Sequence, residues 1–211
     1  MIHIFYYRLV NRMPTELFDH YLQQLPLPLQ KKVMAFRHWQ DAERSMAGSI
    51  LLMKGLASLN IHGYSLPQLK YTTFQKPYYD GTLDFNISHS GSYILCAISE
   101  THRIGVDVEE IKEIPLIDFT DLFYDKEWQA VLNSPDKLHA FYTLWTKKES
   151  FLKVIGSGLN VPLNQVVIEN NTIQWQGQNW WLEEVPLDPS HVSWICMDKP
   201  ASLINITRIE L

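Results

Sequence analysis

The sequence predicts an α+β fold of two similar lobes, each a small sheet packed with one long helix. Two observations predict it. A long helix, which Asp41 can cap, is expected over about residues 42–59, and apolar residues at spacings of three and four predict another over 138–155. Each helix is followed by short strand-like segments. A chain of 211 residues is long enough for two small lobes that share a core.

Composition and charge indicate a globular protein and exclude some partners. Hydrophobic residues make up 46% of the chain and charged residues 19%, which is typical of globular proteins. The formal net charge of -5 gives no global attraction for nucleic acid or anionic membranes, so we expect neither as a partner. Cys96 and Cys196 lie in separate apolar runs and are expected to be buried free thiols. Residues 1–10 are too short and too polar for a secretory or membrane-spanning segment, so we expect a cytoplasmic location.

The N-terminal part is expected to contain a strand, a short helix and a basic segment. Residues 2–9 have strand-like patterning, and residues 14–16 are typical of a helix start. Prolines interrupt the chain before the basic segment at residues 31–37. An irregular region over residues 63–77 follows the first long helix.

Arg44 is unusually placed for a residue with a purely structural role. It lies in the first turn of the expected helix, where a positive side chain opposes the helix dipole. An anion bound near the helix start would explain it. An ion pair with Asp41 or Glu43 would explain it equally well.

Polar residues precede the apolar strand expected over residues 93–98. Ser88 and His89 are neighbours in a strand and point to opposite faces, so they cannot form a nucleophile and its base. They suit contacts to a phosphate better. For His89 a hydrogen-bonded structural role is the other interpretation.

Two acidic residues lie on one face of the strand expected over residues 104–109. Asp107 and Glu109 are two positions apart, about 7 Å along the backbone, and repel each other unless a cation lies between them. Carboxylates without Cys or His favour magnesium over zinc. An acidic pair at a solvated strand end is the alternative.

The helix expected over residues 138–155 carries charges beside its apolar face. At about 100° per residue, Glu149 and Lys148 border that face, Lys153 lies one turn beyond Glu149, and Lys147 points away to solvent. A simple Glu-to-Lys pair four residues apart is one interpretation. Together with the acidic strand, however, these residues indicate three carboxylates for Mg²⁺ with cations for phosphate oxygens, which is typical of phosphoryl-group chemistry.

The rest of the chain is expected to form the sheet of the second lobe, and no pattern in it indicates chemistry. Asn170 and Asn171 are typical of a hairpin turn. The expected strands cover residues 165–168, 172–175, 180–183, 192–197 and 203–210.

Several separated motifs resemble those of one enzyme family. They stand in the order found in 4′-phosphopantetheinyl transferases of the long, two-lobed surfactin type and reach from about residue 31 to 162. The last two motifs, at their mutual distance, are specific, whereas Ser-His-Ser alone is weak. The motifs are Gln75-Lys76-Pro77-Tyr78, Phe85-Asn86-Ile87-Ser88-His89-Ser90, Ile104-Gly105-Val106-Asp107-Val108-Glu109 and Trp145-Thr146-Lys147-Lys148-Glu149-Ser150-Phe151-Leu152-Lys153, with the basic segment and Asp41-Ala42-Glu43-Arg44-Ser45 also fitting.

The resemblance implies a fold and a reaction. The two lobes would form a pseudo-dimer, with residues 1–103 and 104–211 as the lobes and the active site in the cleft between them. Such enzymes move the phosphopantetheine arm of coenzyme A onto a serine of an acyl, peptidyl or aryl carrier protein and leave adenosine 3′,5′-bisphosphate. A monomer that uses Mg²⁺, with coenzyme A and a carrier protein as partners, is therefore expected.

The resemblance also implies roles for individual residues. The metal would be held by Asp107, Glu109 and Glu149, and the pyrophosphate charge would be balanced by Lys148 and Lys153. The proton acceptor would be Glu149, directly or through a metal-bound water, and Glu127 would lie near the metal as a further catalytic residue. The coenzyme A site would be lined by Lys32, Arg44, Ser45, Lys76, Ser88 and His89.

The resemblance places the carrier protein on the segment between Glu109 and Glu127. Leu116, Phe119 and Leu122 are apolar at near-helical spacing and suit a helix-in-groove contact, as does Phe123. Core packing is an equal alternative for the two phenylalanines. Because the chain is acidic overall, we expect carrier contact to be mainly apolar.

The sequence departs from the family pattern at two positions, and two other functions are considered. Gln75 stands where the family often has Gly, and Leu29 stands where a basic residue is frequent, so one phosphate contact is expected to be lost. A non-catalytic protein that binds coenzyme A or a nucleotide is the main alternative. Another Mg²⁺-dependent phosphoryl transferase has no support, because the sequence contains neither a P-loop nor kinase motifs.

Overall fold

The first sheet combines strands from both ends of the chain. In the computed structural model, which describes residues 1–211 except for the side chain of Leu159, this sheet has the order β11-β1-β5-β4. β11 pairs in parallel with β1, whereas the other pairs are antiparallel. The strands are β1 (Ile2–Arg8), β4 (Asp84–Ser90), β5 (Tyr93–Ser99) and β11 (Ile204–Arg208).

The second sheet is antiparallel and has the order β6-β10-β9-β8-β7. Asn170 and Asn171 join β7 to β8 with φ angles of 50° and 57°, which confirms the predicted hairpin turn. The strand predicted over residues 203–210 exists, but its assignment to this sheet was wrong, because β11 lies in the first sheet. The strands are β6 (Ile104–Glu110), β7 (Ile168–Glu169), β8 (Thr172–Trp175), β9 (Gln178–Glu184) and β10 (His191–Met197).

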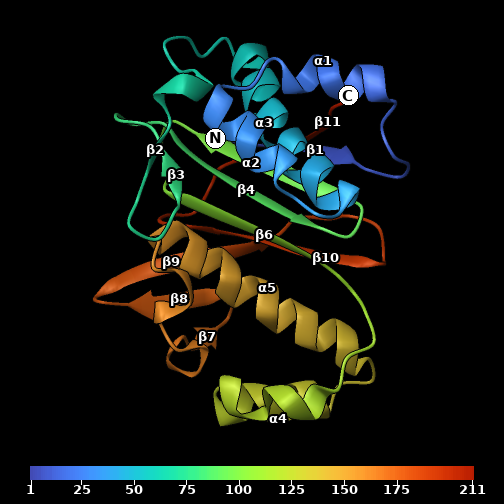
Figure 1. The fold of residues 1–211 in the computed structure, drawn as a ribbon. Coiled ribbons are helices and arrows are strands. Elements are labelled where there is room, and N and C mark those ends of the chain that lie inside the picture. The colour runs from blue at the N-terminus through green and yellow to red at the C-terminus, as the bar shows by residue number, and fades with distance from the viewer.

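One long helix packs on each sheet, as Figure 1 shows. α3 (Trp39–Ser58) covers the first sheet and α5 (Lys137–Ile155) the second, so the predicted α+β architecture with two sheet-and-helix lobes is confirmed. α5 ends at Gly156, whose φ of 71° suits a glycine at a helix end. The shorter elements are α1 (Thr15–Leu22), α2 (Leu27–Met34), α4 (Asp125–Leu132), η1 (Leu66–Gln68), η2 (Leu116–Leu122), η3 (Gly158–Asn160), η4 (Leu163–Gln165), β2 (Lys70–Tyr71) and β3 (Pro77–Tyr78).

The two lobes share a buried apolar layer between their sheets. Ile4 and Leu95 from the first sheet meet Val106 and Ile195 from the second, and all four side chains are fully buried. Their burial stabilises each lobe against the other by the hydrophobic effect. None of the described helices has the length and apolar composition needed to cross a membrane.

Side chains of β4 bond to the backbone of β6 across this joint. The acceptors are alternate residues of β4, which point to the same side of the strand, and each bonds an N–H group twenty residues later. The pairs are Asp84 with Ile104, Asn86 with Val106, Ser88 with Val108 and Ser90 with Glu110, at 2.9, 2.9, 3.3 and 3.1 Å. The lobes are therefore held in a fixed register beside the cleft.

Gly105 allows α5 to lie directly on β6. A Cβ atom at this position would overlap the backbone oxygen of Ser150 and approach the backbone nitrogen of Val154. Glycine thus lets the helix approach the strand that carries Asp107. This close packing sets the distance between the acidic residues of β6 and the charged residues of α5.

Candidate functional site

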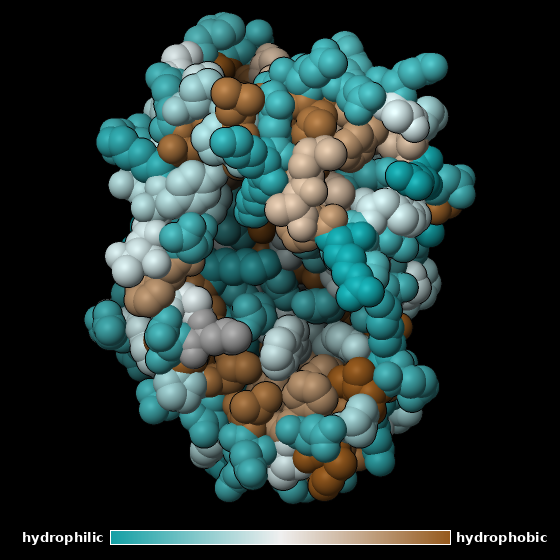
Figure 2. Space-filling view, in the orientation of Figure 1, coloured by the Kyte–Doolittle hydropathy of each residue, from teal (hydrophilic) through white to brown (hydrophobic). Residues whose placement is uncertain are grey.

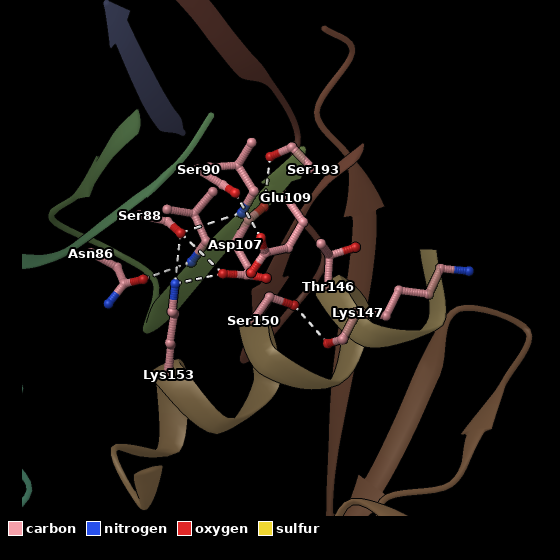
Figure 3. A network of polar contacts seen from close by, with 12 residues as sticks. Asn86, Ser88, Ser90, Asp107, Glu109, Thr146, Lys147, Ser150, Lys153 and Ser193 are labelled. Atoms are coloured by element: carbon pink, nitrogen blue, oxygen red, sulfur yellow. Dashed lines mark hydrogen bonds and ion pairs between the residues drawn. The ribbon is translucent and has the colours of Figure 1, made fainter. Parts of the chain in front are cut away.

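Side chains from three elements meet at the joint between the lobes. Asp107 and Glu109 come from β6, Ser88 and Ser90 from β4, and Lys153 from α5, and Figure 3 shows them pointing toward one another. Side chains alternate between the two faces of each strand, and this alternation places the polar residues of β4 and β6 on the faces that meet. The cluster therefore depends on the register of the two lobes.

Asp107 forms the most connected part of the cluster. Its Oδ1 accepts hydrogen bonds from Lys153 Nζ at 2.6 Å and from Ser88 Oγ at 3.0 Å. Lys153 Nζ also bonds Ser88 Oγ at 2.7 Å. The carboxylate is almost completely buried, whereas the lysine side chain is 27% exposed. Lys153 therefore neutralises Asp107 and still faces the cleft.

Glu109 and Glu149 complete a group of three carboxylates. Ser90 Oγ donates to Glu109 Oε2 at 2.7 Å. Burial, together with the charges of Asp107 and Glu109, raises the pKa of Glu149 to about 7, against the opposing effect of Lys153. Burial and then the charge of Asp107 also raise the pKa of Glu109. These mutual effects indicate that the three acidic groups are close neighbours.

Two oxygen atoms of this group have no hydrogen-bond partner. Asp107 Oδ2 and Glu149 Oε1 are both buried and unpaired, and a buried unpaired carboxylate oxygen is costly. Among the described residues, no three His, Cys, Asp or Glu side chains are already arranged as a metal site. The unpaired oxygens nevertheless fit a small hard cation, since carboxylate oxygens are the ligands that Mg²⁺ prefers.

Two adjoining cavities extend from this cluster along the cleft. A cavity of about 210 Å³ is lined by four predicted residues, Lys32, Arg44, Ser45 and His89. A second cavity of about 180 Å³ is lined by Lys76, Glu149 and Lys153. Both share Gln75, Pro77 and Ile87 as lining residues. Figure 2 shows the molecule hollowed between its upper and lower parts, with hydrophilic side chains in the hollow.

Arg44 is bonded within the first lobe. Its Nε and Nη2 donate to the backbone oxygen of Gly91 at 2.9 and 2.7 Å, and its Nη1 bonds Asp41 Oδ1 at 3.0 Å. The ion pair that was one alternative for Arg44 is therefore present, with Asp41 as the partner. Glu43 instead accepts from the Met13 N–H group at 3.1 and 3.2 Å. Arg44 lines the cavity while it holds the turn at Gly91.

His89 and Lys76 carry shifted pKa values that follow from their surroundings. Burial lowers the pKa of His89, and the charges of Lys153 and Arg44 lower it further. Burial also lowers the pKa of Lys76, against the opposing charge of Asp84, whose Oδ1 lies 3.7 Å from Lys76 Nζ. A nearby phosphate would raise both pKa values, because an anion favours the charged form.

Lys148 does not reach the cleft. Its side chain is fully buried, and its Nζ donates to Glu127 Oε2 at 2.5 Å and to the backbone oxygens of Leu163 and Val166 at 2.9 and 2.7 Å. Glu127 Oε1 accepts from the Ile168 N–H group at 2.9 Å. The structure therefore separates this pair from the acidic cluster, in contrast to the prediction that Lys148 faces the pyrophosphate and Glu127 the metal.

Lys148 is buried because α5 is covered on more sides than its apolar pattern indicates. α4 and the segment after η4 cover the flank that carries Lys148. The sheet covers Lys147, whose Nζ lies 4.0 Å from the Trp194 ring and bonds Asn171 Oδ1 at 2.8 Å. The prediction that Lys147 points to solvent was therefore wrong.

Two protein-family models match the two halves of the chain. The family model of the 4′-phosphopantetheinyl transferase superfamily matches residues 103–200, and that of the N-terminal domain of 4′-phosphopantetheinyl transferases matches residues 13–101. The chain belongs to the 4′-phosphopantetheinyl transferase superfamily.

Curated members of this superfamily resemble the chain over most of its length. The 4′-phosphopantetheinyl transferase gsp of Aneurinibacillus migulanus is 31% identical over 82% of this chain and 74% of its own. The 4′-phosphopantetheinyl transferase Sfp of Bacillus subtilis is 29% identical over 86% of this chain and 85% of its own. The L-aminoadipate-semialdehyde dehydrogenase-phosphopantetheinyl transferase of Xenopus laevis is 27% identical over 77% of this chain and 64% of its own.

Some contacts of this phosphopantetheinyl transferase fold were not predicted from the sequence. Ser90 bonds Glu109, and Asn86 bonds the backbone of β6, yet neither was predicted as a site residue. The spacing of Asp84, Asn86, Ser88 and Ser90 at every second position was the available signal. It indicated one polar strand face but not the edge that this face meets.

Proposed function

We propose that this protein transfers the 4′-phosphopantetheine group from coenzyme A to a serine of an acyl, peptidyl or aryl carrier protein. The serine oxygen forms a bond to the phosphorus on the pantetheine side of the pyrophosphate, and the bond from that phosphorus to the departing adenosine 3′,5′-bisphosphate breaks. The observation that most directly supports this function is the ion pair of Asp107 with Lys153, which lines one cavity together with Glu149 in a transferase-superfamily chain.

Asp107, Glu109 and Glu149 would hold Mg²⁺ as the cofactor. The two buried oxygens without partners, Asp107 Oδ2 and Glu149 Oε1, support this assignment. When bound, the ion would supply electrostatic stabilisation of the pyrophosphate oxygens. Because Asp107 Oδ1 is already bonded to Lys153 and Ser88, its other oxygen is the one that remains for a ligand.

Lys153 is placed to stabilise the charge of the phosphate groups. Its ammonium lies at the floor of the cleft, held by Ser88 and Asp107. Hydrogen bonds that exist before the substrate arrives fix the position of this cation, so little reorganisation is needed as charge develops. Lysine carries a compact charge with three donors, and two of them already have partners. The remaining donor is available to a phosphate oxygen.

Glu149 is the best candidate to accept the proton of the carrier serine. Asp107 is neutralised by Lys153 and Glu109 is bonded to Ser90, whereas Glu149 Oε1 has no hydrogen-bond partner. Its pKa of about 7 applies to the protein without metal, and bound Mg²⁺ would lower it, so the proposed role of Glu149 as proton acceptor depends on its position. The transfer can be direct or through one water molecule.

The two cavities suit coenzyme A. The first carries cationic and hydroxyl groups from Lys32, Arg44 and Ser45 together with His89, which suit the 3′-phosphate and its ribose. Leu29 also lines this cavity, so the cationic contact expected at that position is missing. The second cavity leads past Lys76 to Glu149 and Lys153, where the pyrophosphate would lie.

Intact-mass measurement of an apo carrier protein tests the reaction. The protein, coenzyme A and Mg²⁺ should together increase the carrier mass by one phosphopantetheine group, and a chelator should abolish the increase. Glu149→Gln should lose most of its turnover at saturating magnesium. Near-normal turnover of that variant would exclude the proposed role of Glu149 in proton transfer.

The alternative is a protein that binds coenzyme A without transferring its arm. Calorimetric binding of coenzyme A with no mass increase on any of several acyl and peptidyl carriers would favour this alternative. We also propose that the protein acts as a monomer, which sedimentation of the purified chain tests directly.

A further inference from the structure

A buried histidine of the second lobe contacts the turn that joins β4 to β5 in the first lobe. This turn consists of Gly91 and Ser92, and His191 is the first residue of β10. The Ser92 N–H group donates to His191 Nε2 at 3.4 Å. A Cβ atom on Gly91 would come within 2.6 Å of the same nitrogen, so the ring lies directly on the glycine backbone. His191 therefore supports this turn from the other lobe.

Asp188 fixes the orientation of the histidine ring. Its Oδ1 lies 3.1 Å from His191 Nδ1, and an ionised carboxylate can only accept hydrogen bonds. Nδ1 therefore carries the ring proton, which leaves the lone pair of Nε2 to accept from Ser92. Asp188 Oδ2 also accepts from Arg8 Nη2 at 2.9 Å and from the Tyr93 hydroxyl at 3.2 Å. Because Arg8 and Tyr93 belong to the first lobe, the carboxylate is held from both lobes.

The same turn holds Arg44. The backbone oxygen of Gly91 accepts from Arg44 Nε and Nη2, and Asp41 accepts from Nη1. These bonds use three of the five N–H donors of the guanidinium, so one donor on each terminal nitrogen remains. Arg44 lines the cavity proposed for the 3′-phosphate of coenzyme A. The position of the Gly91 oxygen therefore determines where the two remaining donors point.

We propose that His191, oriented by Asp188, is a positioning residue for Arg44 and thereby sets the preference of the site for coenzyme A over forms without the 3′-phosphate. This inference rests on the proposed function and adds a residue of the second lobe to a phosphate contact in the first. A guanidinium binds a phosphate well only in a matching orientation, because its donors form a fixed fork. Without the support of His191, the turn and the guanidinium bonded to it are free to shift.

The test compares coenzyme A with 3′-dephospho-coenzyme A, which lacks only the phosphate that Arg44 would contact. The amide of asparagine can take the place of Nδ1 in a histidine, but it does not reach the place of Nε2. His191→Asn should thus keep the bond to Asp188 and lose the contact with the turn. We expect KM for coenzyme A to rise about tenfold, the effect of weakening a charge-assisted hydrogen bond. KM for the dephospho form should stay within about twofold of the wild-type value.

The acidic site should not respond to this change. Ser90, the residue before the turn, is held separately, because its Oγ donates to Glu109 Oε2 at 2.7 Å and accepts from the Glu110 N–H group at 3.1 Å. We therefore expect kcat of His191→Asn at saturating coenzyme A to remain within about twofold of the wild-type value. A rise in KM without a fall in kcat distinguishes positioning of Arg44 from a general loss of active protein.

Two further variants test the same contact. The amide of glutamine reaches the place of Nε2, so the side-chain oxygen of His191→Gln can accept from the Ser92 N–H group. This variant should restore most of the preference for coenzyme A. Asp188→Ala removes the acceptor that orients the ring, at a side chain that is 25% exposed, where a substitution is better tolerated than in the core. It should shift KM in the same direction as His191→Asn, and it replaces that variant if His191→Asn does not fold.

His102→Asn is the matched control for stability. His102 is as buried as His191, at 8% against 7% exposure. Its ring bonds Ser99 and Thr101, at the opposite end of β5 from the turn. This variant should leave the preference between the two forms of coenzyme A unaltered. In an Arg44→Ala background, His191→Asn should have no further effect on the preference, because the residue that it positions is absent.

The outcomes distinguish this inference from the proposed function. If the wild-type protein modifies carriers but His191→Asn and Asp188→Ala change KM for both forms of coenzyme A equally, the inference is overturned and the function stands. If the wild-type protein binds both forms with equal affinity in calorimetry, Arg44 does not contact the 3′-phosphate and the inference is overturned. If the protein modifies no carrier, the proposed function is overturned, and the calorimetric affinities of the same variants for the two forms decide the inference.

Discussion

The side-chain oxygen of Asn86 accepts a hydrogen bond from the backbone N–H group of Val106 at 2.9 Å. This bond joins the lobes, because Asn86 lies on β4 of the first sheet and Val106 on β6 at the edge of the second. Side chains of β4 thus satisfy the N–H groups of an edge that no strand covers on this side. The same strand orients the acidic site, since Ser88 and Ser90 also bond Asp107 and Glu109.

Asn86→Ala is expected to destabilise the protein by about 1–3 kcal/mol, because it leaves the buried N–H group of Val106 without a partner. Thermal unfolding should show this as a decrease in Tm of roughly 2–4 °C per kcal/mol. Ser90→Ala provides the comparison, since the Glu110 N–H group that it would leave unpaired is only partly buried; the variant also removes the bond to Glu109, so its loss of stability is an upper limit for the Glu110 bond. If both variants lose the same stability, burial of the N–H group does not set the cost.

Gly105→Ala is expected to be among the most destabilising single substitutions. The added Cβ would overlap backbone atoms of Ser150 on α5, and backbone cannot move aside without shifting the helix. Gly48→Ala provides the comparison, because its Cβ would meet the side-chain atom Ile87 Cγ2 at 2.8 Å, which can reorient. Urea unfolding should give a clearly lower midpoint for Gly105→Ala, and equal midpoints would contradict the packing argument.

The features that could be predicted from the sequence were mostly local. The helix expected over 138–155 is α5 (Lys137–Ile155), and the turn at Asn170 and Asn171 depends on two adjacent residues. The alternation of β6 placed Asp107 and Glu109 on one face. Each of these features follows from the period or the conformational preference of neighbouring residues.

The features that could not be predicted depend on distant contacts. The pattern of β11 indicates a strand, but nothing in it names β1 as the partner two hundred residues earlier in the chain. The amphipathic pattern of α5 predicted that Lys148 borders the apolar face of the helix. In the structure, α4 and the segment after η4 enclose Lys148. Burial by elements far away in the sequence decides which charged residues face the cleft.

Lys148→Met is expected to destabilise the fold by about 3–5 kcal/mol, because it leaves the carboxylate of Glu127 without its cation in a largely buried place. Combining it with Glu127→Met should restore much of this loss, since the double variant buries no unpaired charge. A double-mutant cycle by chemical denaturation measures the coupling.

Steady-state kinetics separate this structural role from contact with the pyrophosphate. For the double variant, measured below its unfolding temperature, KM for coenzyme A should remain within about twofold of the wild-type value. A large rise in that KM, with no coupling of the two residues in stability, would mean that Lys148 contacts the substrate as the sequence predicted.

Glu149 should make the stability of the metal-free protein depend on pH. Its folded-state pKa of about 7 exceeds its ordinary value of 4.5, so its contribution to stability is fully present below about pH 4.5 and is lost as pH rises through 7. After allowance for its partial exposure, the loss is on the order of 2 kcal/mol. Glu149→Gln cannot ionise and should lack this loss.

Thermal unfolding at about pH 5 and about pH 8, with a chelator or with Mg²⁺, measures this dependence. In the chelator, the Tm of the wild-type protein should fall relative to that of Glu149→Gln as pH rises. Mg²⁺ should raise the wild-type Tm more at the higher pH, because a cation binds the ionised carboxylate and competes with the proton. Parallel pH profiles of the two proteins in the chelator would show that Glu149 is not buried beside Asp107 and Glu109.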